Sequence, residues 1–376
     1  NKLDNLINQI VEIDNLIKSK NKNIEISDLS IEQNKGVKKD NKLVEEDNKI
    51  KLSTQEQYIL DNQKFINLDI DIIINKLNKL KNIVLPEQRS KEWYEYRHNM
   101  ITASDLYKVL GTDGIKRDLI IKKCSPIDPN KKVGGGDACR HGIKYEPLAT
   151  KIYELRNNVT ILDFGCIPHQ DNSIPFGASP DGIVSEDNHF YAGRMLEIKC
   201  PYSRVITGKV PEMYWKQVQG QLEVCDLEVC DFLECKFEEY TNEDEFYQDG
   251  DEYKTSLGNE KGIIIVFSNN SLVTEYSYCP IGLSKYKNDY WIEEETNRII
   301  QNENLNFIGI TYWKLCIFSC VLIHRNRNWF KEITPKIIEF WKEIEYYKKI
   351  GIDDLIAKKR TRVKKELILN NECLID

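Results

Sequence analysis

Two carboxylates and a lysine lie close enough in the sequence to act together on one substrate. Asp181 is part of Ser-Pro-Asp-Gly, and Glu197 and Lys199 are part of Met-Leu-Glu-Ile-Lys, which has the pattern of a short strand. Because strand side chains alternate between two faces, Glu197 and Lys199 share one face and Ile198 points the other way, into a core. Carboxylates bind hard cations such as Mg²⁺, and a neighbouring ammonium can assist a metal-bound water or stabilise developing charge. The pattern indicates metal-assisted hydrolysis of a phosphodiester.

The same residues also fit a simpler interpretation, an exposed hairpin in which Glu197 and Lys199 form a surface ion pair. Such a pair contributes only about 0–1 kcal/mol and has no catalytic role. Pro-Asp followed by Glu-x-Lys occurs in many charged proteins, so this motif alone leaves both interpretations open.

The composition limits the class of protein. With 376 residues, 41% of them hydrophobic, the chain can form one large domain with extensions or two domains. Its formal charge of −7 predicts that any DNA-binding surface is a local basic patch. The 11 cysteines include no Cys-x-x-Cys, and the 5 histidines form no cluster with them. This spacing argues against a zinc site or a disulfide framework and favours a reducing compartment.

The sequence begins with Asn and shows no secretory signal, so we expect a fragment of a longer chain. The most apolar stretch, 308–323, is interrupted by Lys314 and is short for a membrane span, so we interpret it as buried strands. We expect an intracellular protein of the host cytoplasm or nucleus that is not secreted and does not enter a membrane.

Composition divides the chain into 1–85, 86–350 and 351–376. The first part is rich in Asn and Lys and carries two apolar stripes at steps of three and four, which predict helices. These helices either form a coiled coil for oligomerisation or pack on the domain. The polar segment 18–57 between them predicts a disordered linker. The last part contains KKRTRVKK at 358–365 and either contacts DNA, serves as a nuclear address or forms a solubilising end.

Polar groups early in the middle part are suited to phosphate. Arg97 and Ser104 lie in a predicted helix–turn–helix, in which Thr102 or Ser104 caps a second helix that runs to Leu110. A hydroxyl at a helix N-terminus beside a guanidinium can bind phosphate. A basic loop at 116–132 and the glycines that follow it could close around a DNA backbone. The ordinary alternatives are a surface arginine, a simple cap and a solvated linker.

Two predicted helices flank the carboxylates in the sequence. Glu146 lies within the first, at 138–157, just before Pro147, where we expect a helix end or kink from which the carboxylate can reach a metal. Gln217 lies on the second, which starts near Pro211, and flanks its buried stripe. A helix laid on the sheet can direct Gln217 to the active face. Otherwise the two side chains are an ordinary surface glutamate and an ordinary flanking glutamine.

Five sequence blocks, taken in order, resemble the YqaJ / lambda-exonuclease family of viral recombination nucleases, which belongs to the PD-(D/E)XK superfamily. The blocks are W-x3-R followed by ITAS, then G-x3-E-P, ASPDG, EIKCP and Q-V-Q on a helix, across about residues 88–235. The resemblance implies that Asp181 and Glu197 are the principal metal carboxylates. It implies that the carbonyl of Ile198 and the side chain of Glu146 complete the metal shell.

The same resemblance assigns the remaining polar residues. Lys199 is the implied catalytic lysine, and Gln217 orients the lysine, the water or the terminal phosphate. Arg97, Ser104 and Ser179 are implied to form a pocket for the 5′-phosphate of DNA.

The implied fold is α/β, with a PD-(D/E)XK restriction-endonuclease-like core whose central mixed sheet is flanked by helices, plus a helical N-terminal extension. The implied activity is a Mg²⁺-dependent exonuclease, with Mn²⁺ as a substitute, acting 5′ to 3′ on double-stranded DNA ends in viral recombination or repair. A single-strand annealing protein and further copies of the chain are the expected partners. The alternatives are an endonuclease or alkaline-nuclease-like resolving enzyme, and a catalytically inactive DNA-binding or scaffold protein.

Overall fold

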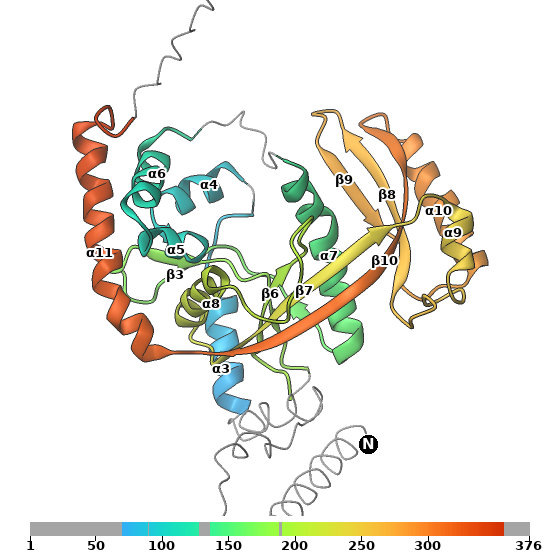
Figure 1. Cartoon of the computed structure of the whole chain (residues 1–376), viewed down its shortest axis with the longest axis horizontal. Helices are drawn as coiled ribbons and strands as arrows, with labels where there is room; N and C mark the ends of the chain where they lie inside the picture. Colours follow the sequence, from blue (N-terminus) through green and yellow to red (C-terminus); the bar gives the residue numbers. More distant parts are fainter. Residues whose placement is uncertain (1–69, 89, 128–135, 188–189, 357–376) are drawn as a thin grey trace, which may run out of the picture.

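This computed structural model describes residues 70–88, 90–127, 136–187 and 190–356, which form both helices and strands (Figure 1). The helices are α3 (Ile70–Lys81), α4 (Lys91–His98), α5 (Leu106–Val109), α6 (Asp113–Cys124), α7 (Asp137–Asn157), α8 (Glu212–Cys225), α9 (Glu243–Gln248), α10 (Lys285–Ile300) and α11 (Arg327–Ile350), with a 3-10 turn η1 (Ala103–Asp105). The strands are β1 (Ile101–Thr102), β2 (Ile161–Leu162), β3 (Ile167–Pro168), β4 (Phe176–Ala178), β5 (Gly182–Val184), β6 (Met195–Lys199), β7 (Val229–Glu239), β8 (Lys261–Asn269), β9 (Thr274–Tyr278) and β10 (Leu305–His324).

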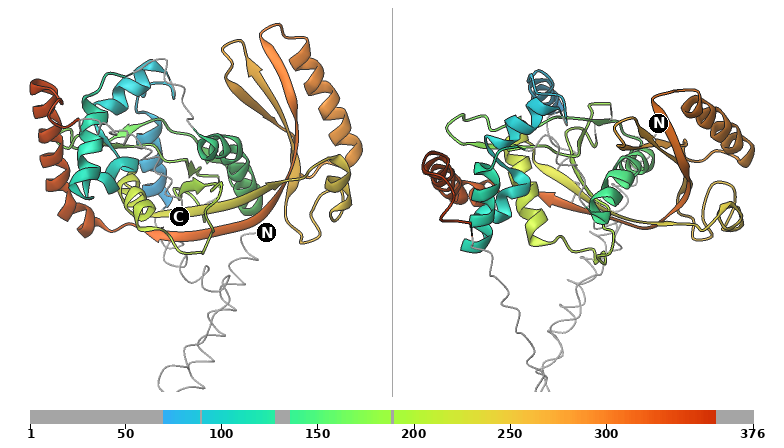
Figure 2. Two further views of the ribbon diagram at one scale, coloured as in Figure 1. Left: turned by 45° about the horizontal axis from the view of Figure 1, so that its top comes forward. Right: turned by 90° about the horizontal axis from the view of Figure 1, so that it is seen from above.

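Within these residues a seven-stranded mixed sheet forms the centre, in the order β2-β5-β6-β7-β10-β8-β9. β6 and β7 are parallel, and α8 lies between them in the chain as the crossover that a parallel pair requires. The other neighbouring strands are antiparallel. The long strands β7 and β10 run between the helices α4, α5, α6, α8 and α11 at one end and β8, β9 and α10 at the other (Figure 2). The predicted α/β class, a mixed sheet flanked by helices, is confirmed.

A second, three-stranded sheet, β1-β4-β3, carries the ITAS and ASPDG blocks side by side. β1 pairs with β4 in parallel, Ile101 opposite Phe176 and Thr102 opposite Gly177. Helix α8 lies against this sheet at Gly220, where a Cβ would come within 2.8 Å of the Phe176 ring. Glycine therefore allows the close approach of α8 to the small sheet, and this approach brings the polar face of α8 near the end of β4.

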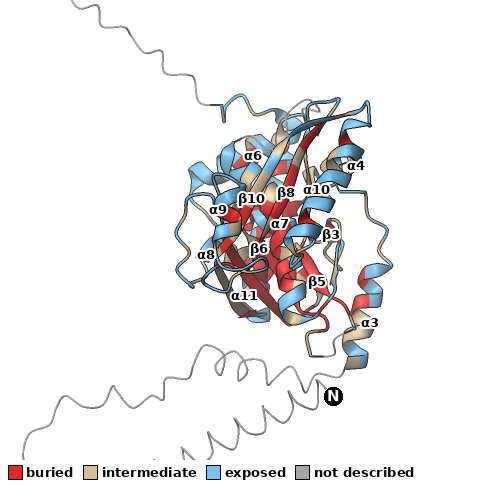
Figure 3. Ribbon diagram, turned by 90° about the vertical axis from the view of Figure 1, so that its right-hand side faces the viewer, coloured by how far each residue is buried: buried red, intermediate tan, exposed pale blue. Residues whose placement is uncertain are grey.

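The two faces of β6 pack into different hydrophobic cores, as the strand alternation predicts. Leu196 and Ile198 are buried with residues of α7, whereas Met195 is buried in the core that contains α8 and α11. Figure 3 shows the buried strands enclosed by helices whose outer faces are exposed. Glu197 consequently faces α8 from the middle of the fold.

Helix α3 belongs to the main core. Leu77 and Leu80 are 0% and 5% exposed and pack within that core. Lys76 Nζ donates a 2.6 Å hydrogen bond to the carbonyl of Asp226, at the end of α8. For the second apolar stripe of the N-terminal part, the structure favours packing on the domain over a coiled coil. The first stripe, the linker 18–57 and the basic tail 358–365 lie outside the described residues.

The predicted basic loop is wrong over its first part, because residues 113–124 form α6. Leu119 and Ile120 are buried on one side of this helix, and Lys123 is buried as well. Lys123 Nζ donates to the carbonyls of Arg97 and Met100 at 2.8 and 2.6 Å. The many charged residues of this segment led to its interpretation as a loop, although its apolar residues have helical spacing. The lysines at 131 and 132 and the following glycines 134–135 lie outside the described residues.

Two predicted helix ends also differ from the structure. Neither Thr102 nor Ser104 caps a helix through a side-chain hydrogen bond, because ITAS instead forms β1 and the start of η1. No helix end occurs at Pro147, since α7 continues through it to Asn157. Burial of neighbouring residues such as Tyr145 and Leu148 stabilises α7 across the proline.

Two further segments refine the sequence interpretation. The apolar stretch 308–323 lies in one long strand, β10, but only Trp313, Leu315 and Ile323 of it are buried, so the prediction of a buried stretch is wrong for most of its length. Part of the acidic run after Glu238 forms α9, whose Phe246 is buried. Across the described segments, none of the helices has the length and apolarity that crossing a membrane requires.

Candidate active site

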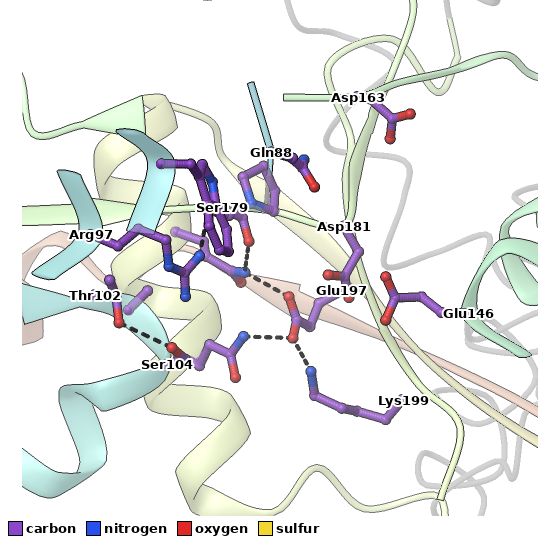
Figure 4. Close-up of a pocket in the computed structure, with 15 residues that line it drawn as sticks. Gln88, Arg97, Thr102, Ser104, Glu146, Asp163, Ser179, Asp181, Glu197 and Lys199 are labelled. Atoms are coloured by element: carbon purple, nitrogen blue, oxygen red, sulfur yellow. Dashed lines mark hydrogen bonds and ion pairs between the residues drawn. The ribbon is translucent and has the colours of Figure 1, made fainter. Parts of the chain in front are cut away.

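A polar cavity of about 270 Å³ lies where α4, the small sheet, β6 and α8 meet (Figure 4). All eight side chains singled out from the sequence line it: Arg97, Ser104, Glu146, Ser179, Asp181, Glu197, Lys199 and Gln217. They come from α4, η1, α7, the loop before β5, β6 and α8. The fold therefore brings together residues that are far apart in the chain.

Glu197 lies at the centre of this cavity and is 0% exposed. Its Oε1 accepts hydrogen bonds from the ammonium of Lys199 and, at 2.6 Å, from Gln217 Nε2. Its Oε2 accepts a 2.6 Å hydrogen bond from Gln221 Nε2. The alternative of an exposed hairpin with a surface ion pair is wrong, because this carboxylate is fully buried.

Asp181 stands beside Glu197 because β5, which follows it, pairs antiparallel with β6 and places Gly182 opposite Leu196. Asp181 Oδ2 accepts a 2.7 Å hydrogen bond from the backbone N–H of Ile198. Burial raises the pKa of Asp181 well above its ordinary value, and the nearby charges of Glu197 and Glu146 raise it further, against the opposing effect of Lys199. Figure 4 shows the carboxylates of Asp181 and Glu146 directed toward each other beside Glu197, whose own carboxylate is turned toward its hydrogen-bond donors.

Lys199 is the cation of this group. Burial alone would lower the pKa of Lys199, but Glu197 and Asp181 outweigh that effect and raise it. One ammonium faces three carboxylates, of which Glu197 is buried, Asp181 half-buried and Glu146 exposed, so their ionised forms carry an excess of negative charge. Such an excess is unfavourable unless a further positive charge is bound.

The donor set fits a hard divalent cation. Carboxylate oxygens are the ligands that Mg²⁺ takes, and a divalent charge would offset the repulsion within the cluster. Among the described residues, no three Asp, Glu, His or Cys side chains are already arranged to hold a metal. The hydrogen bonds of Glu197 are consistent with this, because a cation would compete with Lys199, Gln217 and Gln221 for its oxygens.

The opposite side of the cavity offers donors suited to phosphate. Arg97 Nη1 donates a 2.9 Å hydrogen bond to Ser179 Oγ, and the guanidinium lies 4.3 Å from the centre of the Trp93 ring. The hydroxyls of Thr102 and Ser104 are 3.1 Å apart. A guanidinium held by stacking, together with hydroxyls, is a favourable setting for a phosphate group. Carboxylates and phosphate donors thus face each other across one small cavity.

Sequence reasoning did not assign to the site several residues that line the cavity: Gln88, Trp93, Thr102, Asp163 and Gln221. A signal existed for Gln221, because it follows Gln217 by one helical turn and therefore shares its face of α8. No comparable spacing points to Gln88 or Asp163, which are exposed and come from connecting segments. The side chain of Ile198 packs in the core as predicted, whereas its carbonyl as a metal ligand stays a prediction.

Comparison with known proteins agrees with the motifs. Residues 92–228 match the family described as the YqaJ-like viral recombinase domain, which confirms the resemblance. An uncharacterized protein of Acanthamoeba polyphaga mimivirus is 31% identical over 309 residues, which cover 73% of this chain and 55% of that protein. The chain thus spans about half the length of this relative. A protein of African swine fever virus, from a Malawi isolate, is 23% identical over 335 residues, 77% of this chain and 95% of the viral protein.

Solved structures show more distant likenesses. An alkaline exonuclease from Laribacter hongkongensis has a TM-score of 0.41 and 19% identity, covering 69% of this chain and 95% of that one. A phage-related exonuclease from Haemophilus somnus has a TM-score of 0.36 and 13% identity, covering 68% of this chain and 96% of that one. These likenesses are too distant to assign a role to any residue.

Proposed function

We propose that this chain, which matches the YqaJ-like viral recombinase domain over residues 92–228, is a Mg²⁺-dependent exonuclease that hydrolyses double-stranded DNA from 5′ ends. The observation that carries the proposal is the convergence of Glu146, Asp181 and Glu197 with Lys199 in one cavity, opposite Arg97. Carboxylates that converge with an ammonium around the buried Glu197 suit a metal-assisted phosphodiester hydrolase, whereas a binding protein would have no use for their mutual repulsion.

Each group has a role in this proposal. Asp181 and Glu197, together with Glu146 and the carbonyl of Ile198, would hold the cation. When bound, Mg²⁺ would polarise the phosphoryl oxygen and lower the pKa of an attacking water. Mn²⁺, which takes the same oxygen ligands, would substitute for it. The ammonium of Lys199 stabilises negative charge on the scissile phosphate, and Gln217 fixes the orientation of the Glu197 carboxylate.

The phosphate side of the cavity would define the end of the substrate. Arg97, Ser104 and Ser179 would bind a terminal 5′-phosphate and so place the first phosphodiester over the carboxylates. Binding a terminus in this way favours exonuclease action over internal cleavage. Digestion from 5′ ends leaves a single strand, which a single-strand annealing protein would receive in viral recombination or repair within the host cell.

Digestion of linear duplex DNA tests the proposal. The wild-type chain should degrade 5′-phosphorylated DNA in Mg²⁺ or Mn²⁺ but not in EDTA, and should leave a covalently closed circle intact. Asp181→Asn and Lys199→Ala should each lower the rate at least 100-fold, a typical loss for removal of a charge-stabilising group. Asp163→Asn, at an exposed carboxylate of the same cavity, is the matched control and should digest normally.

Three outcomes would redirect the proposal. Cleavage of the closed circle would indicate an endonuclease or resolving enzyme. Wild-type rates in both the Asp181 and Lys199 variants would reject the assigned site. DNA binding without any cation-dependent digestion would indicate a catalytically inactive DNA-binding protein.

A further inference from the structure

Gln221 connects the two sides of the cavity. It is 0% exposed on α8, and its Nε2 donates to Glu197 Oε2 at 2.6 Å and to the backbone carbonyl of Ser179 at 3.2 Å. Its Oε1 is buried and has no hydrogen-bond partner among the residues that the structure describes. One amide thus contacts both the central carboxylate and the loop that carries the phosphate-binding hydroxyl.

The orientation of this amide follows from its neighbours. A carboxylate and a carbonyl can only accept hydrogen bonds, so the NH₂ group must face them both. Turning the amide over would place Oε1 against two acceptors. The consequence is that Oε1 remains buried without a donor, which is unfavourable and uncommon in folded proteins. An apolar side chain would avoid this cost, so the two bonds from Nε2 are the feature that distinguishes glutamine here.

These contacts form a continuous path across the site. Arg97 Nη1 donates to the hydroxyl of Ser179 at 2.9 Å, the carbonyl of Ser179 accepts from Gln221, and Gln221 donates to Glu197. A group that binds Arg97 and Ser179 therefore acts on the same short network as a group that competes for the oxygens of Glu197.

We propose that Gln221 is a positioning residue that couples the phosphate pocket to the carboxylate cluster, so that a divalent cation and a terminal phosphate strengthen each other's binding. The inference rests on the proposed function and adds a regulation of its site. Lys199 and Gln217 donate to Oε1 of Glu197 and Gln221 donates to Oε2, so a cation that binds this carboxylate competes with a set of donors that includes Gln221. A shift of the Ser179 loop on phosphate binding would act on the same Gln221 amide and so alter the position of Oε2.

Coupling of this kind is reciprocal and can be measured without catalysis. The binding of duplex DNA labelled with a fluorophore, carrying either a 5′-phosphate or a 5′-hydroxyl end, is followed by anisotropy in Ca²⁺ and in EDTA. Gel analysis verifies that the DNA stays intact. In the wild-type chain, Ca²⁺ should increase the preference for the phosphorylated end by about fivefold or more. In Gln221→Met, the preference in Ca²⁺ and in EDTA should agree within about twofold.

Gln219→Met is the matched control, because it changes the same residue type on the same helix. Gln219 is 1% exposed, but its Nε2 donates to the carbonyl of His324 at 2.8 Å and its Oε1 accepts from the N–H of Asn326 at 2.6 Å. It contacts neither side of the cavity. The control variant should lose stability while keeping the wild-type effect of Ca²⁺ on end preference.

The outcomes separate this inference from the proposed function. Full coupling in a folded Gln221→Met variant overturns the role of Gln221 while leaving the nuclease assignment intact. If the variant does not fold, the Ca²⁺ affinity of the wild-type chain is compared with phosphorylated and with hydroxyl-ended DNA. Equal affinities exclude coupling between the cation and the terminal phosphate. A wild-type chain that neither distinguishes the two ends nor digests DNA in Mg²⁺ overturns both proposals.

Discussion

Replacing Asp181 with Asn should stabilise the cation-free protein while removing its response to Mg²⁺. Asp181 is held against Glu197 and Glu146, and burial together with these like charges raises its pKa. Asn has nearly the same shape, and its Oδ1 can still accept the hydrogen bond that the Ile198 N–H donates to Asp181. The substitution removes charge repulsion and retains packing, so it should stabilise the fold. Active sites are often less stable than their surroundings because activity requires charges that repel one another.

The magnitude follows from these contacts. Relief of repulsion in a charged site typically adds about 0.5–2 kcal/mol, which for a chain of this size raises the melting temperature by roughly 1–2 °C per kcal/mol. In Mg²⁺ at 100 times its dissociation constant, the wild-type chain should gain about 2.7 kcal/mol, whereas Asp181→Asn should gain little. The order of the two melting temperatures should therefore reverse between EDTA and saturating Mg²⁺.

Thermal unfolding followed by circular dichroism, in EDTA and across a Mg²⁺ titration, measures both effects. Asp163→Asn serves as the control, since Asp163 is exposed and its carboxylate lies apart from the cluster in Figure 4. It should stay within about 0.5 kcal/mol of the wild type in either condition. The reasoning is refuted if Asp181→Asn melts below the wild type in EDTA, or if Mg²⁺ stabilises the two proteins equally.

Three further predictions concern the scaffold. Arg194→Leu should lower the free energy of unfolding, measured in urea, by about 3–5 kcal/mol, because it leaves the fully buried Asp231 without the guanidinium whose Nη1 lies 3.2 Å from its Oδ2. A loss below about 1 kcal/mol would contradict this. Leu77→Ala should lower the free energy of unfolding by about 2–5 kcal/mol and shift the whole unfolding transition, since Leu77 is 0% exposed in the main core. If α3 alone unfolds and the midpoint of the transition does not change, this helix is not part of the domain. Asp105 is buried, which favours its neutral form, yet three lysine ammonium groups at 2.9, 3.4 and 3.8 Å outweigh burial and hold its pKa below the ordinary value. The stabilising contribution of the Asp105 carboxylate is therefore complete above the unfolded-state pKa of about 3.9 and is lost as pH falls through the lower folded-state pKa. The difference in unfolding free energy between the wild type and Asp105→Asn should be about 1–3 kcal/mol at pH 6 and should shrink toward pH 3. A difference that does not change with pH would contradict this.

The candidate catalytic residues are far apart in the chain, and only the family resemblance predicted that they form one site. The five blocks identified Arg97, Glu146 and Gln217 as members of one site, and the structure brings all three to one cavity. Local rules alone predicted for Glu146 a helix end or a kink at Pro147, and the helix does not end there. Its carboxylate reaches the cavity because α7 packs on the face of β6 that carries Ile198, a tertiary contact with no local signature.

What the sequence by itself determined is the arrangement along β6. A strand has a period of two, so Glu197 and Lys199 had to share a face, and apolar neighbours on the other face had to bury the strand. Only the tertiary structure decided which helix covers that face, since this depends on the close approach of α8 at Gly220. The bridging role of Gln221 follows from that packing, because a side chain's partners across a cavity depend on contacts between distant segments rather than on its own neighbours in the chain.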